Sequence, residues 1–244
     1  MTEPQAKQLR ILALDTAQED LTVAALDGAA LLADAAAHVG SRHAEEILSM
    51  TARVLDAAGL KKTDIDLIAF GAGPGAFTGL RVACGVAQGL AWALERPVAS
   101  VCNLEALALG CARALALPAG VRIAAVHDAR MNECYAAVYE TTDRLRLKEV
   151  AAPALLKPEA VCEYMREMGA SILCGSAKPV YEAVTLPEGA QYAEGVKASA
   201  ALIGEIAAQM AASGQTTAAS AAAPLYVRNR VALTIDERAR GERL

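Results

Sequence analysis

Two parts of the chain begin in the same way, and this repeat limits the possible folds more than any other feature. The apolar stretch "LRILALDT" covers residues 9–16 and ends near an acid, and "VRIAAVHDAR" does the same from residue 121. The second stretch follows a proline- and glycine-containing segment at 118–120, which is typical of a turn. A chain of 244 residues is long enough for two lobes. We therefore expect related lobes at 1–117 and 118–244, with the last helix able to pack back on the first lobe.

The first half predicts three meandering strands followed by alternating helices and strands. The three strands are expected at 9–16, 21–26 and 30–37, with the hairpin signal Asp27-Gly28 before the last. We further expect helices at 41–58, 78–95 and 103–117, capped by Ser41, Thr78 and Asn103, and strands at 66–73 and 97–101. This order predicts an α/β fold with a mixed sheet flanked by helices. The same order is found in the ribonuclease H-like lobes of the actin, Hsp70 and sugar-kinase superfamily.

The second half repeats this plan in a degenerate form. After the strand that starts at residue 121, we expect strands at 134–140, 144–150 and 171–175 and helices at 158–168 and 198–212. The low-complexity stretch 216–223 is expected to be a loop or a frayed helix end, and the charged tail 236–244 to be mobile. The sequence thus predicts two ribonuclease H-like lobes, each with a mixed sheet and flanking helices.

The composition argues against several classes of function. The net charge is −5 and no cluster of Lys and Arg stands out, so the sequence does not indicate direct binding of nucleic acid. None of the six cysteines forms a C-x-x-C pair, and all lie in apolar stretches, which favours reduced thiols over a disulfide framework. The longest apolar stretch, 82–94, is too short to span a bilayer, and the first residues are polar. We expect a soluble cytoplasmic protein without membrane contacts.

The glycine-rich stretch "AFGAGPGAFTGLR", at 69–81, sits where α/β proteins often hold a phosphate. A Walker loop needs a lysine that this region lacks, and Pro74 removes an N–H that a dinucleotide site would use. The simpler interpretation is a tight loop in which Gly73 and Gly75 supply unusual backbone angles and Phe77 fills the core. An anion at the following helix N-terminus stays an open alternative.

The helix after this loop is apolar on nearly every side. Such a helix must be covered on more than one face. One face can meet its own sheet, and the other needs the first helix, the second lobe or another protein. Gly85 and Gly89 stand four residues apart, so they share one face and permit close approach of another helix.

Titratable residues give little support to catalysis. His38, His43 and His127 do not form an H-E-x-x-H pattern, so no metal site is expected. Asp15 resembles the acid that actin-like kinases place near magnesium and phosphate, which leaves a small-molecule phosphotransferase as an alternative. Gly175-Ser176 is at most a remnant of a nucleotide contact in the second lobe. No G-x-S-x-G motif is present.

Arg130 and Glu133 flank a turn in the second lobe. They are able to fix a lobe interface through a charge-assisted bond, although a solvated turn is the simpler interpretation.

Several motifs together carry a family resemblance. They are "ILALDTAQEDLTVAAL", "SRHAEEIL", "GAGPGAFTGLRVACGVAQGLA", "DARMNECYAAVY" and "PLYVRNRVA", which span most of the chain. With them the chain resembles the TsaB (YeaZ) family of the bacterial tRNA threonylcarbamoyladenosine machinery. The resemblance implies a noncatalytic scaffold that activates TsaD, the subunit that transfers a threonylcarbamoyl group to adenosine 37 of tRNA. A peptidase of the glycoprotease type is the least favoured alternative, since no residue supports peptide hydrolysis.

The resemblance also implies partners and cofactors. TsaD would form a heterodimer with the chain, TsaE would bind the pair, and TsaC would supply the adenylate. Contact with tRNA would be indirect, and the chain alone would be able to form a homodimer. No intrinsic cofactor is expected, and ATP or ADP would bind only in the complex.

Family members pair through the first two helices of the N-terminal lobe, which correspond here to 41–58 and 78–95. We expect an interface that includes His43, Ile47, Met50, Val54, Arg81, Ala83, Ala87 and Gly89. A vestigial or shared nucleotide site would comprise Asp15, Gly73, Gly75 and Thr78. On this hypothesis Ala87→Arg abolishes pairing with little effect on the fold.

Overall fold

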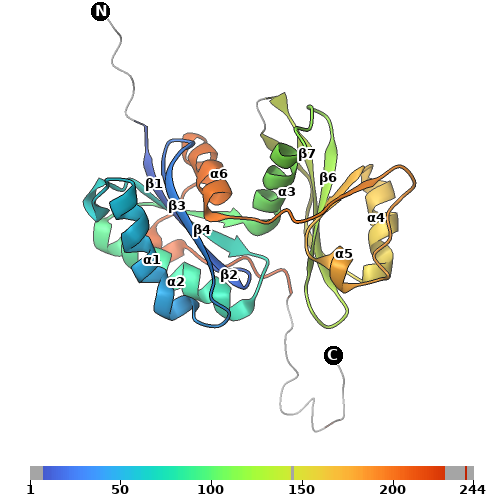
Figure 1. The fold of residues 1–244 in the computed structure, drawn as a ribbon, viewed down its shortest axis with the longest axis horizontal. Coiled ribbons are helices and arrows are strands. Elements are labelled where there is room, and N and C mark those ends of the chain that lie inside the picture. The colour runs from blue at the N-terminus through green and yellow to red at the C-terminus, as the bar shows by residue number, and fades with distance from the viewer. Residues whose placement is uncertain (1–7, 144–145, 229–239, 241–244) are drawn as a thin grey trace, which may run out of the picture.

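The chain forms two lobes that lie next to each other (Figure 1). A computed structural model describes residues 8–143, 146–228 and 240. Each lobe contains a five-stranded mixed sheet, and the strand orders are β3-β2-β1-β4-β5 and β10-β9-β6-β7-β8. Read in reverse, the second order is β8-β7-β6-β9-β10, in which each strand takes the position of its counterpart in the first sheet. The predicted α/β fold with two ribonuclease H-like lobes is therefore confirmed.

The first lobe follows the expected order of elements. Its elements are β1 (Arg10–Asp15), β2 (Asp20–Asp27), β3 (Ala30–His38), α1 (His43–Ala57), β4 (Leu67–Gly73), α2 (Phe77–Leu94), β5 (Val98–Cys102) and α3 (Asn103–Ala114). β1 pairs antiparallel with β2 and parallel with β4, because a tight hairpin joins the first two strands and helical crossovers join the later ones.

The second lobe repeats this order with shorter late elements. It contains β6 (Arg122–Asp128), β7 (Cys134–Thr141), β8 (Leu147–Leu156), α4 (Val161–Met168), β9 (Ile172–Cys174), α5 (Ala177–Val180) and β10 (Gln191–Ala193). The last helix, α6 (Ala200–Ala212), follows these elements in the chain and lies on the first lobe. The strand expected at 144–150 begins later, at Leu147, and its residues 144–145 lie outside the described part. Of the charged tail at 236–244, only Arg240 is described.

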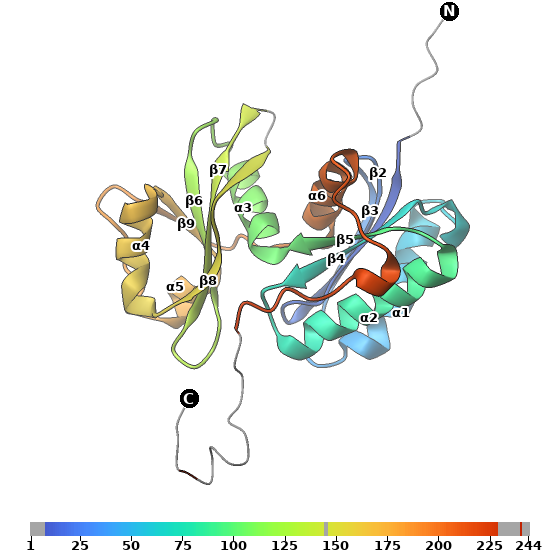
Figure 2. The same cartoon turned by 180° about the vertical axis from the view of Figure 1, so that it is seen from behind.

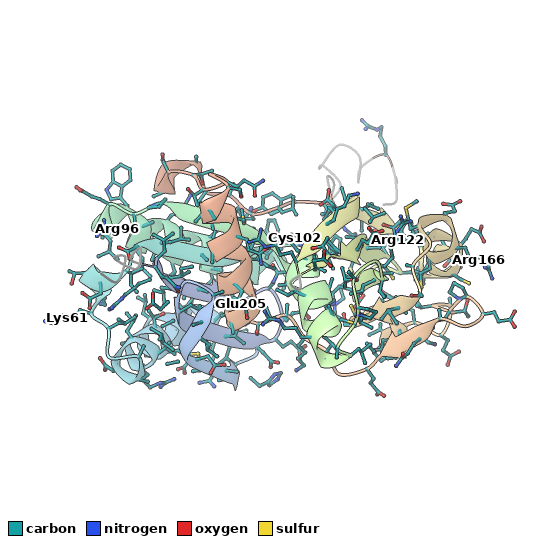
Figure 3. All side chains as sticks on the ribbon, turned by 90° about the horizontal axis from the view of Figure 1, so that it is seen from above. Lys61, Arg96, Cys102, Arg122, Arg166 and Glu205 are labelled. Carbon is teal, nitrogen blue, oxygen red and sulfur yellow. The ribbon has the colours of Figure 1, made fainter. Side chains whose placement is uncertain are left out.

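Two helices link the lobes. α6 packs on β1 and β2 of the first sheet, whereas α3 packs on β6 and β7 of the second. α3 packs on both lobes, because Ala106 and Leu109 belong to the apolar cluster between the first sheet and α6, while other apolar residues of the helix pack against the second sheet. Arg113 of α3 and Glu205 of α6 form an ion pair where these helices meet. Figure 3 shows Cys102, at the end of β5, between the two lobes.

The first sheet is covered on both faces. One face packs against α1 and α2, and the other against α6, which forms a second apolar cluster. α1 and α2 run side by side on the outer face of the lobe (Figure 2). The segment expected to be a loop at 216–223 forms a β-bridge between Thr217 and Val98 and then a 3-10 turn, Ala219–Ala221, against α2.

Candidate functional site

The glycine loop brings the end of β1 into close contact with the start of α2. The Ala76 N–H donates to the carbonyl of Ala17 at 2.8 Å, and Thr16 Oγ1 donates to the carbonyl of Gly79 at 2.6 Å. A Cβ at Gly75 or Gly79 would collide with backbone atoms of this same segment. Glycine is required at these positions because two backbones meet there, which confirms a tight loop.

Two details predicted for the loop are wrong. Phe77 does not fill the core, since 44% of its surface is exposed and its ring instead lies against Tyr226. Thr78 does not cap the helix, because the N-cap position is Ala76 and no side chain caps it. Ser41 also lies outside the N-cap position of α1, which is Arg42. The first turn of α2 is held by backbone packing against β1 rather than by a capping side chain.

Asp15 belongs to a closed network of buried hydrogen bonds. Asn103 Nδ2 and the Ala17 N–H each donate to Asp15 Oδ1 at 3.0 Å, and Asn103 Oδ1 accepts from the Gly73 N–H at 2.8 Å. Burial raises the pKa of Asp15, while the bonds from Asn103 and Ala17 oppose this shift. The side chain is only 3% exposed, so it ties β1, β4 and α3 together.

This network bears on the nucleotide site that the sequence suggested. An acid that holds a magnesium nucleotide needs an accessible carboxylate, whereas that of Asp15 is buried and already accepts hydrogen bonds from Asn103 and Ala17. Gly73 and Gly75 are required by the backbone of the loop, and the side chain of Thr78 is exposed on α2. The residues present in this chain therefore do not fit that cofactor. Asn103 is also not the cap predicted for α3, since the N-cap position is Cys102 and the Asn103 side chain donates to Asp15 instead. This contact could not be predicted, because the two residues are 88 positions apart in the chain.

Most residues expected at the helix interface are buried in the chain's own core. His43, Ile47, Met50, Val54, Ala83 and Ala87 all have at most 8% of their surface exposed. In this chain these side chains therefore have little or no surface available for direct contact with a partner. The periodicity that singled them out is that of the face packed on the sheet. Arg81 and Gly89 do lie on the outer surface.

The outer face of α1 and α2 is partly apolar and open. Trp92 has 74% of its surface exposed, and Leu48 of the adjacent helix 57%. A Cβ added at Gly85 or Gly89 would meet nothing within 4 Å. Gly85, Gly89 and Trp92 also border a groove whose other wall is Ala219 and Ser220. We call the exposed residues Leu48, Gly85, Gly89 and Trp92 the outer face.

The buried histidine in the second lobe is held by a serine. His127 Nδ1 lies 3.1 Å from Ser176 Oγ, and burial lowers the pKa of His127 to about 4. Its neighbour Asp128 points away, toward Tyr181 and Arg130. His127 is thus a neutral packing residue at neutral pH.

The structure also places the remaining candidates. Within 8–143, 146–228 and 240, no group of three or more His, Cys, Asp and Glu residues is arranged to hold a metal. All six cysteines are free thiols. In the same ranges no helix is long and apolar enough to cross a membrane. Glu133 forms ion pairs with Lys157 and with Arg228, which belongs to the segment that comes from the first lobe, so Glu133 does make a charge-assisted bond between the lobes. Arg130 instead pairs with Asp128 of its own turn.

Comparison with known proteins decides the family. A family model described as TsaD, tRNA N6-adenosine threonylcarbamoyltransferase, matches residues 37–242. TsaB, the tRNA threonylcarbamoyladenosine biosynthesis protein of Escherichia coli K12, is 35% identical over 92% of this chain and 96% of its own length. The chain belongs to the TsaB (YeaZ) family. TsaB of Haemophilus influenzae is 39% identical over 53% of each protein.

A solved structure agrees with this assignment. YeaZ from Pseudomonas aeruginosa is 34% identical and superposes with a TM-score of 0.78, covering 89% of this chain and 99% of its own. The shared fold includes both lobes. Membership of the TsaB family gives the chain a role in tRNA threonylcarbamoyladenosine biosynthesis.

Proposed function

We propose that the chain is the noncatalytic scaffold subunit of the threonylcarbamoyl transfer complex and pairs with a TsaD-type subunit through the outer face of α1 and α2. The observation that carries this proposal is the exposure of Trp92 beside two glycines with open space above them. A side chain as large as tryptophan is costly to leave in water, and exposed apolar patches mark interaction sites.

The shape of the outer face favours a helical partner. Gly85 and Gly89 lie one turn apart and bring the helix backbone to the surface, which permits ridges of a second helix to approach closely. Trp92, one turn further on, supplies the aromatic anchor that dominates many interfaces. The partner resembles this chain in sequence, since the TsaD family model matches it, so the same face is also able to support a homodimer of the free chain.

A noncatalytic role is supported by the state of the residues that would otherwise react. Asp15 is buried and hydrogen-bonded to Asn103, and His127 is buried and hydrogen-bonded to Ser176. We propose that ATP or ADP binds only in the complex, where the partner supplies the site. TsaE would join the assembled pair, TsaC would supply the adenylate, and tRNA would meet the complex in the cytoplasm.

A reconstituted reaction tests the proposal. The measurement is formation of threonylcarbamoyladenosine from tRNA, threonine, bicarbonate and ATP with TsaC, TsaD and TsaE, with and without this chain. Product is expected only when the chain is present, and Asp15→Asn is expected to leave it unchanged. Formation of product without the chain would contradict a scaffold role. Loss of product with a normally folded Asp15→Asn variant would favour a catalytic role for the chain.

The interface itself needs a variant that leaves the fold intact. Gly89→Arg adds a charge to the centre of the outer face, where a side chain has room, and it should weaken pairing with TsaD by about 100-fold or more. Gly89→Ala adds one methyl group and serves as the matched control. The Ala87→Arg variant is unsuitable, because Ala87 is fully buried in the core. If Gly89→Arg pairs as tightly as Gly89→Ala, the interface lies elsewhere.

A further inference from the structure

The segment after α6 runs from the first lobe to the second (Figure 2). The Leu225 N–H donates to the carbonyl of Ala72 at 2.7 Å, which fixes the segment beside the glycine loop. Tyr226 then meets the start of α2, where its ring centroid lies 5.8 Å from that of Phe77. Arg228 reaches the second lobe, so a few residues join the first turn of α2 to the β6–β7 turn.

Arg228 holds a turn with an unusual backbone. The consecutive residues Arg130, Met131 and Asn132 have φ values of 62°, 56° and 54°, which are unfavourable for side chains with a Cβ. Arg228 donates to the carbonyls of Ala129 and Arg130 at 2.9 and 3.4 Å, and it pairs with Glu133. Strain of this kind persists only where surrounding structure enforces it, and it is concentrated at functional positions.

The two lobes thereby build one exposed surface with a distinct chemistry. We call it the platform, and it consists of Phe77, Arg81, Arg130, Met131, Leu225 and Tyr226. All six are exposed. The Arg81 guanidinium lies 3.8 Å above the centre of the Phe77 ring, and its Nε donates to Tyr226 Oη at 3.3 Å.

The charge of this region differs from that of the whole chain. The ion pairs around the turn involve Arg130, Lys157 and Arg228 but only Asp128 and Glu133 as acids. Arg81 forms no ion pair within the described residues and interacts with aromatic groups instead. These ion pairs leave one positive charge in excess and Arg81 adds a second, so this region of a chain of net charge −5 suits an anionic ligand. Half-exposed rings next to arginines suit unstacked bases, because guanidinium and aromatic planes both stack on them.

We propose that the platform binds single-stranded nucleotides of the tRNA, so that this chain contacts RNA directly as well as through its partner. Arg81 and Arg130 would meet phosphates, while Phe77 and Tyr226 would stack on bases. The proposal depends on the proposed function only for the identity of the RNA, because the binding surface belongs to this chain alone.

The test is titration of a fluorescently labelled, unmodified tRNA transcript with the full chain at low salt, followed by anisotropy. Phe77→Ala with Tyr226→Ala should weaken binding about fivefold or more, as expected for loss of base stacking. Arg81→Gln should reduce the salt dependence by about one counterion. Leu31→Ala removes an exposed apolar side chain elsewhere, and Arg166→Gln removes a charge from the far end of the second lobe (Figure 3). Both controls should bind like the original chain.

Three results would overturn the proposal. One is absence of tRNA binding by the original chain, and another is equal binding by the platform variants with an unchanged thermal transition. The third is that the platform variants still bind tRNA but lose affinity for TsaD or TsaE, which would make the platform a docking surface for a protein. Pairing through Gly89 is measured without RNA, so failure of the platform leaves the scaffold proposal standing.

Discussion

Replacing Asn103 with leucine should lower the free energy of unfolding by about 2–6 kcal/mol, because two buried groups lose their partner together. Asn103 accepts from the Gly73 N–H and donates to the Asp15 carboxylate, and its own exposure is 1%. A buried donor or acceptor without a partner costs about 1–3 kcal/mol, and more when the group is charged. Leucine has a similar size, so the loss would come mainly from hydrogen bonding.

Urea denaturation followed by circular dichroism measures this change. His38→Ala is the control, because it removes a 3.0 Å contact to Asp20 from an exposed side chain. That variant should change the free energy of unfolding by about 0.5 kcal/mol or less. The double variant Asp15→Asn with Asn103→Leu completes a cycle, and the two effects should differ from additivity by about 0.5–3 kcal/mol.

Additive effects, or a loss below about 1 kcal/mol for Asn103→Leu, would refute the reasoning. Either result would mean that Asp15 and Gly73 find other partners when Asn103 is absent. It would also reopen the question of whether the Asp15 carboxylate is free for chemistry. The assay therefore tests directly the closed network that supports a noncatalytic role.

Two further variants probe other parts of the chain. Gly79→Ala should lower the free energy of unfolding by about 3 kcal/mol or more, because its Cβ would collide with the Thr16 backbone. Gly85→Ala should raise it by about 0.5–1 kcal/mol, because a Cβ there has room and alanine favours the helix. Thermal melting measures both variants, and equal effects would contradict the close approach at Gly79. Burial, and to a smaller extent the nearby charge of Glu149, raises the pKa of Glu105 from 4.5 to about 7. The folded chain therefore holds the Glu105 proton more tightly than the unfolded chain does, and the free energy of unfolding falls as the pH rises from 4.5 to 7. Glu105→Gln should remove that decline and raise stability above pH 7 in a pH series of urea denaturations; an unchanged pH profile would contradict it.

The order of elements was predictable because each is encoded locally. The hairpin signal Asp27-Gly28 joins β2 to β3, and Gly59 follows α1 with a φ of 67° as a helix terminator. The short elements α5 and β10 were not predicted. They contain only four and three residues, which is too few for a periodic pattern.

The orientation of the candidate interface was not predictable from α2 itself. A helix with apolar residues all round has no pattern that distinguishes the face on the sheet from the face in solvent. Ala87 and Trp92 are both apolar, yet one is fully buried and the other mostly exposed. The contacts of Asn103 and Arg228 were equally hidden, because their partners lie 30 to 99 positions away.

The duplicated plan of the lobes explains why only the first lobe offers the outer face. α1 and α2 contain 15 and 18 residues, but the corresponding α4 and α5 contain only eight and four. A helix of 18 residues is about 27 Å long and presents several turns to a partner, whereas four residues form about one turn. Long paired helices in the first lobe and short ones in the second thus fit a chain in which one lobe pairs and the other supports it. On this argument, shortening α2 should reduce pairing far more than shortening α5.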